Sequence, residues 1–394
     1  MSWNRRTTLI YTLVRFFIIF YLLFITAACA SDDSSNSADG VSGSDTDSIN
    51  NTDTSNESDD NEKTDMCRNA FENQMTNILK DLETDTDFTL FLETEDGHAF
   101  TFNRGDSTLF TSYLSASTSK WVFASIILRL VDQEILSLTD RPQDHIPNWE
   151  IPESDPLYEM TLYELLSLTS GLSIDNECVN HANSDFENCI RDIAKINIEN
   201  GDVPGVKFDY NHNHFQVAAL MAIKAAGVDT WQDIYENFKA ETGLFADSAY
   251  DYPSLNNPRM AAGMHWQASD YIDFIRAFQF GNLLTDKSKS QMLMDYIRTS
   301  AIVNSPIVDS LNEEWHYGLG IWLECPQENF NCQTIYYYSS PGIYGAYPFM
   351  NTQYNFFGIV ARMGNIDTIA QGKAVYDAVS DLAEQWAQVP ASCQ

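Results

Sequence analysis

Basic residues are scarce in this sequence of 394 residues. Lys and Arg together number 22 against 56 Asp and Glu, which gives a formal net charge of −34 and a pI near 4.2. Nucleic acids are polyanions that need a basic face on their partner, so the composition excludes them as a partner. Hydrophobic residues make up 44% of the chain and aromatic residues 13%, which is enough for a large packed core.

Apolar runs long enough to cross a membrane are also lacking at the N-terminus. The run from Phe16 to Ala28 has thirteen residues, whereas a bilayer core of roughly 30 Å needs about 20 helical residues. A basic start, a short apolar run and small residues before a break are typical of a secretory signal, here residues 1–28. The segment before Cys29 resembles a bacterial lipobox, which implies a lipid on Cys29. The alternative is an ordinary signal peptide cut near Ala28 or Ala30.

The next segment, residues 29–66, lacks aromatic residues. From Ala30 to Met66 it holds eleven acidic residues and one Lys, among many Ser, Asn and Thr. Such a segment buries too little apolar surface to offset the entropy of ordering, so we predict a disordered, self-repelling tether. The folded domain should then cover residues 67–394. These features predict an exported protein, lipid-anchored in the bacterial cell envelope and facing the periplasm or the outer membrane.

Seven cysteines are present, and export would expose them to an oxidising compartment. With Cys29 set aside for lipid, six remain, and six cysteines allow fifteen pairings. Proximity favours Cys178–Cys189 and Cys325–Cys332, which leaves Cys67 and Cys393 to join the two ends of the domain. No Cys-x-x-Cys or His-x-x-x-His spacing accompanies them, so we predict no metal site and no cofactor.

The hydrophobic pattern predicts an α+β fold. Two apolar runs, 88–93 and 99–103, flank Asp96-Gly97 and indicate a hairpin. Helices are expected at 121–132, 161–167, 215–226 and 270–280, and strands return at 317–324, 334–339 and 355–362 before a last helix at 373–387. We therefore expect an antiparallel sheet, joined by both ends of the domain and flanked by helices, beside a mainly helical region.

Ser117 and Lys120 stand just before the apolar helix predicted at 121–132. If Ser117 lies at the start of that helix, Lys120 faces the same side one turn later. A serine hydroxyl is a poor nucleophile that needs a nearby base, which a desolvated lysine can provide, and a helix N-terminus presents free amides to an oxyanion. A polar cluster before an apolar helix is equally typical of a plain N-cap.

The wider sequence resembles the serine β-lactamase and penicillin-binding protein superfamily, in its class C-like branch, which also holds esterases and peptidases. The resemblance runs from about residue 88 to residue 383. The motifs that carry it, in chain order, are Ser117-x-x-Lys120, Glu134–Asp140 (EILSLTD), Thr161–Leu172 (TLYELLSLTSGL), Phe208–Phe215 (FDYNHNHF), Ala262–His265 (AGMH) and Tyr317–Gly320 (YGLG).

The resemblance implies a β-lactamase/transpeptidase-like fold and a serine hydrolase that cleaves a small-molecule ester or amide. Ser117 would be the acylated nucleophile, Lys120 its general base, and Tyr210 a phenol that assists proton transfer. The Ser117 amide would supply half of an oxyanion hole, and the strand of the third motif the other half. No metal or organic cofactor is implied.

Two motifs depart from the family pattern. Ser340 stands where the third motif has Lys or His, although Gly342 fits the motif's glycine, and we expect Ser340, Gly342 and Ile343 to contact substrate. His212 occupies the position of the second motif's Asn, and it too is a candidate substrate contact. In the family the missing cation helps to hold a substrate carboxylate, so the departures favour an esterase-like member over a β-lactamase or a D-alanyl-D-alanine carboxypeptidase.

Two other classes of function stay open. A penicillin-binding or sensor-like protein would keep the fold and an acylable Ser117 without turnover. An inert structural module would be unaffected by Ser117→Ala apart from helix capping.

Overall fold

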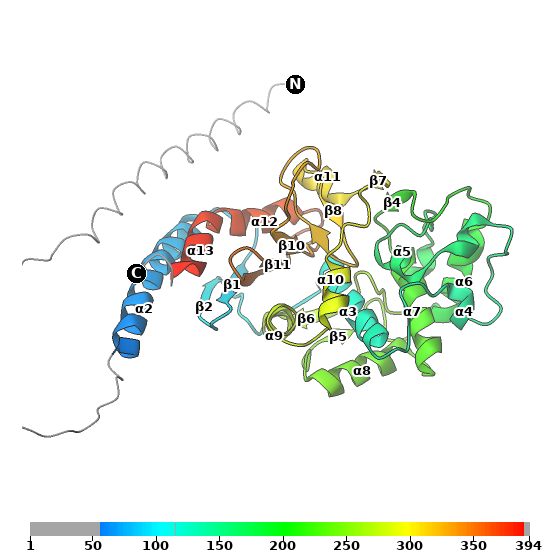
Figure 1. Cartoon of the computed structure of the whole chain (residues 1–394), viewed down its shortest axis with the longest axis horizontal. Helices are drawn as coiled ribbons and strands as arrows, with labels where there is room; N and C mark the ends of the chain where they lie inside the picture. Colours follow the sequence, from blue (N-terminus) through cyan, green and yellow to red (C-terminus); the bar gives the residue numbers. More distant parts are fainter. Residues whose placement is uncertain (1–55, 115, 390–394) are drawn as a thin grey trace, which may run out of the picture. The chain divides into compact units, whose positions relative to one another are not determined.

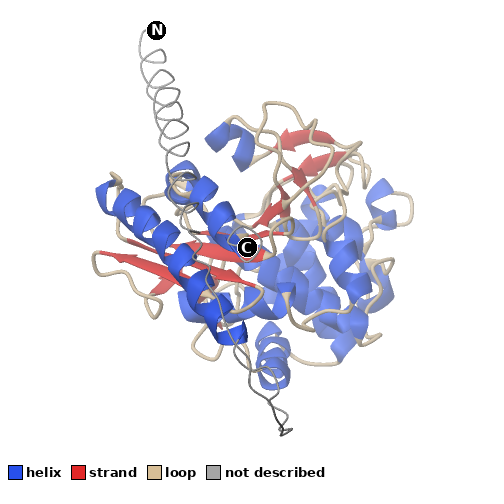
Figure 2. Ribbon diagram, turned by 60° about the vertical axis from the view of Figure 1, so that its left-hand side comes forward, coloured by secondary structure: helices blue, strands red, loops and turns tan. Residues whose placement is uncertain are grey.

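The computed structural model describes residues 56–389 with the exception of residue 115. Their centre is an antiparallel sheet of seven strands in the order β2-β1-β12-β11-β10-β9-β8, flanked by helices and adjoining a mainly helical region (Figures 1 and 2). The predicted fold class is confirmed. The strands are β1 Phe88–Thr94, β2 Ala99–Arg104, β8 His316–Tyr317, β9 Trp322–Leu323, β10 Tyr337–Ser339, β11 Tyr347–Asn351 and β12 Phe356–Ala361.

The first strand and the last strand of the described chain, β1 and β12, are paired in this sheet. The predicted hairpin is β1–β2, with Leu92 opposite Phe100 and Gly97 in the turn at φ +81°. On its other side β1 pairs with β12, where Leu90 lies opposite Val360. Every residue of β1 is buried because the strand lies inside the sheet and helices cover it.

Helices pack on both faces of the sheet. α2 (Asn56–Asp81), α12 (Ile369–Asp377) and α13 (Ser380–Ala387) lie on one side, and α9 (Ala268–Gln279) lies on the other (Figure 1). The indole of Trp386 in α13 is buried and donates to Glu72 of α2 at 2.9 Å, which joins the two helices. α9 directs Phe274 and Phe278 against Trp121 of α3 (Ser119–Asp132), with ring centroids 5.5 and 5.3 Å apart.

The helical region surrounds α7 (Asn213–Ala226). From Asn213 to Ile223 every residue of α7 is buried: residues 217–223 are all apolar, and the polar Asn213, His214 and Gln216 form hydrogen bonds. Gly227 ends the helix at φ +67°. The remaining helices of the described chain are α4 Pro142–His145, α5 Leu162–Leu166, α6 Phe186–Asn197, α8 Trp231–Thr242, α10 Asp286–Met292 and α11 Pro306–Leu311, with short 3₁₀ turns η2 Pro156–Glu159 and η3 Glu177–Asn180.

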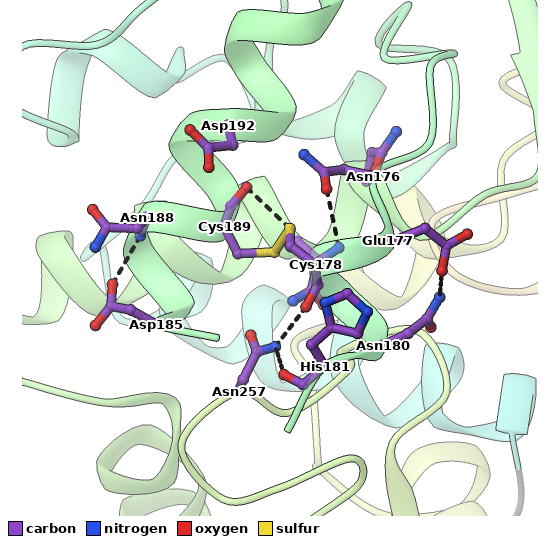
Figure 3. Close-up of a disulfide and its surroundings, with 12 residues drawn as sticks. Asn176, Glu177, Cys178, Asn180, His181, Asp185, Asn188, Cys189, Asp192 and Asn257 are labelled. Atoms are coloured by element: carbon purple, nitrogen blue, oxygen red, sulfur yellow. Dashed lines mark hydrogen bonds between the residues drawn. A yellow bond between two sulfur atoms is a disulfide. The ribbon is translucent and has the colours of Figure 1, made fainter. Parts of the chain in front are cut away.

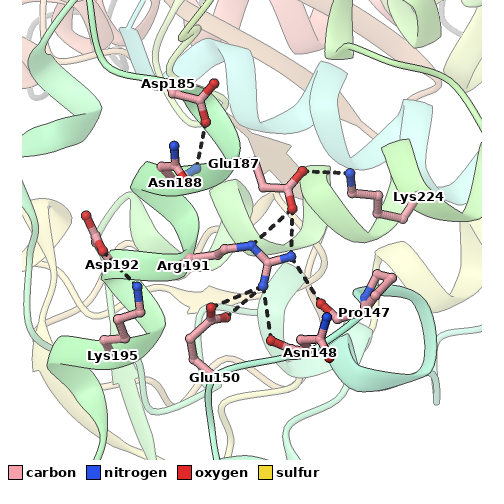
Figure 4. A network of polar contacts seen from close by, with 10 residues as sticks. All are labelled: Pro147, Asn148, Glu150, Asp185, Glu187, Asn188, Arg191, Asp192, Lys195 and Lys224. Carbon is pink, nitrogen blue, oxygen red and sulfur yellow. Dashed lines mark hydrogen bonds and ion pairs between the residues drawn. The ribbon is translucent and has the colours of Figure 1, made fainter.

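A polar network fastens α6 within this region (Figure 4). The guanidinium of Arg191 donates to Glu187 at 2.6 Å, to Glu150 at 3.1 Å and to the carbonyl of Asn148 at 3.1 Å. Lys224 of α7 donates to the other oxygen of Glu187 at 2.6 Å. The ammonium and the guanidinium hold the pKa of Glu187 below its usual value, and the network joins α6, α7 and the loop after α4.

Several elements differ from the sequence predictions. The strand expected at 317–324 is a hairpin, β8–β9, because the chain reverses at 318–321, where Gly320 has φ +76°. The helix expected at 373–387 is two helices, α12 and α13, and strand β11 was missed. Residues 56–66, part of the predicted disordered tether, are helical in α2, where each added residue extends an existing hydrogen-bonded helix.

Two predicted disulfides are confirmed. Cys178–Cys189 joins η3 to α6 (Figure 3), and Cys325–Cys332 closes a loop after β9. Cys393 lies outside the described residues, so its predicted pairing with Cys67 stays a prediction. The same holds for the signal segment, for Cys29 and for most of the tether. Among the helices that the structure describes, none has the length and apolar character needed to cross a bilayer.

Candidate active site

Ser117 lies on a 3₁₀ turn, η1 (Ala116–Thr118), between β3 (Ser112–Leu114) and α3. Ala116 precedes it at φ +50°, a conformation that costs a non-glycine residue energy and that neighbouring contacts must maintain. The Ser119 hydroxyl donates to the Ala116 carbonyl at 2.7 Å, and the Tyr271 hydroxyl donates to the Thr118 carbonyl at 2.8 Å. These buried hydrogen bonds fix the turn that presents Ser117.

The Lys120 side chain returns to Ser117 from the first turn of α3, as the spacing predicts. Its Nζ donates to Ser117 Oγ at 3.0 Å and to the carbonyl of Ala261 at 3.0 Å, and the residue is only 1% exposed. Within the described residues no carboxylate lies within 4.0 Å of this amine. Burial, with a contribution from the charge of Arg259, holds the pKa of Lys120 well below its usual value. The amine is thus suited to accept a proton from the serine.

Tyr210 completes this group. It follows β4 (Lys207–Asp209), and its ring lies 4.3 Å from Lys120 Nζ and stacks on Trp322 of β9 at 5.2 Å. Burial raises the pKa of Tyr210, and hydrogen bonds with the Ser117 and Trp322 side chains oppose the rise without cancelling it. Tyr210 therefore stays a neutral phenol that can donate a hydrogen bond. The structure brings together all three predicted residues.

The segment after β10 supplies backbone groups next to Ser117. The amide of Ser340 donates to the Pro348 carbonyl at 3.1 Å, that of Gly342 donates to Ala346 at 2.8 Å, and Pro341 has no N–H. Ile343 is the next residue, and its amide makes no hydrogen bond within the described part of the chain; the same is true of the Ser117 amide. These two amides are the candidates for an oxyanion hole.

The structure separates the predicted contacts of the third motif. Ile343 lines the cavity at Ser117, but Ser340 and Gly342 do not. Ser340 is only 2% exposed, and its hydroxyl donates to the Ser117 carbonyl at 3.0 Å. The Ser340 hydroxyl therefore helps to fix the backbone at Ser117. The family motif has Lys or His at the position of Ser340.

A cavity of about 360 Å³ opens at Ser117. His212 lines it, and its Nδ1 is buried without a hydrogen-bond partner among the described residues, as a predicted substrate contact requires. Burial and neighbouring cations lower the pKa of His212 well below its usual value, so the imidazole is neutral. His214 is different: its nitrogens bond Ser170 Oγ at 2.7 Å and the Asp209 carbonyl at 3.0 Å, and burial lowers its pKa to about 3.

Other residues that line the cavity were not predicted. They come from loops, strand ends and helix α11, whose proximity depends on the tertiary fold, and they include Tyr252, Arg259, Asn304, Ile307 and Trp322. A loop arginine in one sequence carries no pattern that distinguishes it from a surface charge. Metal-ligating side chains do not gather in groups of three or more anywhere in the described chain.

A sequence model of the family named Beta-lactamase matches residues 94–368. This chain belongs to the beta-lactamase family. The match includes Ser117, Lys120, Tyr210 and the segment of Ser340, so the site lies inside the part that defines membership. A comparison with curated proteins finds no match.

Solved structures share the fold of this beta-lactamase family member. A putative beta-lactamase from Bacteroides dorei DSM 17855 is 21% identical, with TM-score 0.63, over 81% of this chain and 97% of that one. A beta-lactamase/D-alanine carboxypeptidase from Yersinia pestis is 16% identical, with TM-score 0.62, over 82% and 99%. EstCE1, a hydrolase with promiscuous acyltransferase activity, is 15% identical, with TM-score 0.61, over 82% and 99%.

Proposed function

We propose that this chain is an exported serine hydrolase of the class C-like branch, which cleaves an ester or amide through an acyl-enzyme on Ser117. The observation that carries the proposal is the 3.0 Å contact between Lys120 Nζ and Ser117 Oγ at the wall of a cavity. A buried amine without a carboxylate partner at a serine hydroxyl is suited to general-base catalysis.

In acylation, the Ser117 hydroxyl gives its proton to the Lys120 amine as Oγ attacks the substrate carbonyl carbon. The carbonyl oxygen becomes an oxyanion, which the amides of Ser117 and Ile343 would stabilise. The tetrahedral intermediate collapses when the bond to the leaving group breaks. Tyr210, held as a neutral phenol, lies where it can pass a proton to the leaving group and regain one from Lys120.

Deacylation runs through the same groups in reverse. Water takes the place of the leaving group and loses a proton to the neutral Lys120 amine as its oxygen attacks the acyl carbon. The bond to Ser117 Oγ then breaks, and the serine regains its proton. A second, non-turnover form of this chemistry would stop before this step, as the sensor-like alternative requires.

The proposal favours esters over β-lactams. Ser340 occupies the position at which the family has a cation or an imidazole, and its hydroxyl is engaged with the Ser117 carbonyl. The EstCE1 structure, described as a hydrolase with promiscuous acyltransferase activity, has the same fold. We further propose a lipid anchor on Cys29 in a bacterial membrane, on the basis of the signal and lipobox resemblance.

The test is hydrolysis of 4-nitrophenyl butyrate and of nitrocefin by the folded protein. Ser117→Ala is compared with Ser112→Ala, which alters an exposed serine on the neighbouring strand β3. We expect sustained ester turnover that Ser117→Ala abolishes and Ser112→Ala retains, with little hydrolysis of nitrocefin. A burst of one equivalent without turnover would support the sensor-like alternative, and equal rates for both variants would refute a role for Ser117.

A further inference from the structure

Arg259 and Lys120 are the two basic residues, Lys or Arg, that line the cavity in the described structure. Arg259 lies on the loop between β5 (Ala249–Tyr250) and β6 (Met264–Gln267) and lines the same cavity as Ser117 and His212. Ion pairs hold most of the Lys and Arg side chains in the described chain, as expected from the excess of acid. Arg259 has no such pair: within the described residues, no carboxylate oxygen lies within 4.0 Å of its guanidinium.

The guanidinium is held by groups that leave its charge uncompensated. Its Nη2 donates to the amide oxygen of Asn180, and its Cζ lies 5.5 Å from the centroid of the Tyr252 ring. Its Nε is buried and has no hydrogen-bond partner in the described part of the chain. Glu177 is the carboxylate that acts on it through space, but that side chain accepts a hydrogen bond from Asn180 Nδ2 at 2.7 Å.

The support beneath Arg259 is rigid. Asn180 belongs to η3, which the Cys178–Cys189 disulfide ties to α6 (Figure 3). Asn257, two residues before Arg259, donates to the carbonyls of Cys178 and His181 at 2.9 Å each, so the two loops are joined on both sides of the contact. The guanidinium is therefore placed at the cavity in advance of any ligand.

The chain has a net charge of −34, yet no carboxylate of the described residues pairs with Arg259. Because a partly buried charge without a partner is costly, an anionic ligand in the cavity would be stabilised by this guanidinium. Since the Lys120 amine serves as a base in its neutral form, Arg259 is left as the positive charge that a ligand meets. A guanidinium presents parallel N–H donors whose geometry matches a carboxylate. Apolar side chains, Ile343, Ile366 and Ile369, line other parts of the cavity and would contact the rest of the ligand.

We propose that Arg259 binds a carboxylate of the substrate, so that the enzyme prefers esters whose carboxylate reaches the β5–β6 loop and not the third-motif segment, where the family holds the carboxylate of a β-lactam. The inference rests on the proposed hydrolase function and adds a residue and a substrate class to it. In this chain the carboxylate would be bound from the β5–β6 loop, because Ser340 of the third-motif segment carries no charge.

The test compares matched pairs of esters that differ in charge. One pair carries the charge on the acyl group: the 4-nitrophenyl monoester of adipic acid against 4-nitrophenyl hexanoate. The other carries it on the leaving group: 4-carboxyphenyl butyrate against 4-carbamoylphenyl butyrate. The readout is the ratio of kcat/KM within a pair, corrected for uncatalysed hydrolysis. Any effect on folding or on Lys120 itself changes both members of a pair and cancels in the ratio.

The variants are Arg259→Gln, Arg259→Lys and Lys287→Gln, the last removing one exposed charge remote from the cavity. We expect the wild type to prefer the anionic ester of at least one pair, and Arg259→Gln to lower that preference about 10- to 100-fold, as for loss of a charge-assisted hydrogen bond. Arg259→Lys should retain part of it, and Lys287→Gln all of it.

The outcomes separate the two proposals. If the wild type hydrolyses the esters and Arg259→Gln leaves the ratios of both pairs unchanged, the hydrolase stands and the carboxylate site is refuted. If Lys287→Gln lowers the ratios as much as Arg259→Gln does, the preference comes from overall charge and the site is again refuted. If none of the esters is hydrolysed and Ser117 is not acylated, the hydrolase itself fails.

Discussion

Gly320→Ala should displace the helix turn that carries Lys120, the proposed general base. Gly320 lies in the turn between β8 and β9 at φ +76°, and a Cβ added to it would lie 2.5 Å from the Ala124 Cβ and 2.8 Å from the Lys120 carbonyl oxygen. Both atoms belong to α3, which carries Lys120. Relief of the contact requires α3 or the turn to move by several tenths of an ångström.

The chain provides a matched control at Gly201. Its φ is +78°, nearly that of Gly320, but a Cβ there would meet no atom within 4 Å. Gly201→Ala therefore carries the backbone cost alone, about 1–2 kcal/mol. Gly320→Ala carries that cost and the cost of overpacking, about 1–3 kcal/mol more. Displacement of a catalytic group by about 1 Å can lower the rate about 100-fold.

The assay measures two quantities for each variant: the free energy of unfolding in denaturant, and kcat/KM for an activated ester under conditions where the protein is folded. We expect Gly201→Ala to keep wild-type activity and Gly320→Ala to lose about 10- to 100-fold, in addition to its larger loss of stability. Equal destabilisation of the two variants, with activity unchanged in both, would refute the packing of Gly320 against the Lys120 turn.

Three further predictions concern the base, a buried acid and a disulfide. Lys120→Met should lower kcat/KM by at least about 100-fold, and wild-type activity should persist at pH values well below the usual pKa of a lysine, because burial lowers the pKa of this amine. Burial raises the pKa of Glu324 to about 7, so its contribution to stability is present below pH 4.5 and is lost as the pH rises through 7. Glu324→Gln should lack that loss. The difference in free energy of unfolding between Glu324→Gln and the wild type should therefore change by about 3 kcal/mol in favour of the variant between pH 4.5 and 8. Replacement of Cys178 and Cys189 by Ala should lower the free energy of unfolding by about 3 kcal/mol, the loop-closure entropy for a separation of 11 residues.

Each of these has a result that would contradict it. A pH profile of Lys120→Met that matches the wild type in shape and height would exclude the amine as the base. Parallel stability curves for the wild type and Glu324→Gln would show that the carboxyl titrates normally, and Glu153→Gln, at an exposed position, is the control. An unchanged unfolding midpoint in the double alanine variant would show that the disulfide does not stabilise η3.

The sequence predicts best what depends on local pattern. The β1–β2 hairpin is found because Asp96-Gly97 separates two apolar runs, and the buried helix α3 because its apolar residues are continuous. Ser117 and Lys120 are three residues apart on one turn, so their contact also follows from local geometry. The pairings of Cys178 with Cys189 and of Cys325 with Cys332 follow from proximity in the chain.

What the sequence does not predict depends on contacts between distant segments. β11 was missed because Pro348 stands inside it, which disfavours a strand in the sequence pattern, and because its burial comes from its partners β10 and β12. Arg259 is placed at the cavity by its contacts with Asn180 and Tyr252. Asn180 is 79 residues earlier in the chain, so the sequence gives no sign of the contact. The role of Ser340 also needs the fold, because only the three-dimensional structure joins its hydroxyl to the carbonyl of Ser117.

Intact mass measurement after acid quench decides whether Ser117 forms a covalent acyl-enzyme. The folded protein is mixed with excess 4-nitrophenyl butyrate for a time shorter than one turnover, quenched, weighed and digested. We expect a mass increase of one butyryl group, located on the peptide that contains Ser117 and absent from Ser117→Ala. A protein that releases nitrophenol with no adduct, or with the adduct on another residue, would contradict it.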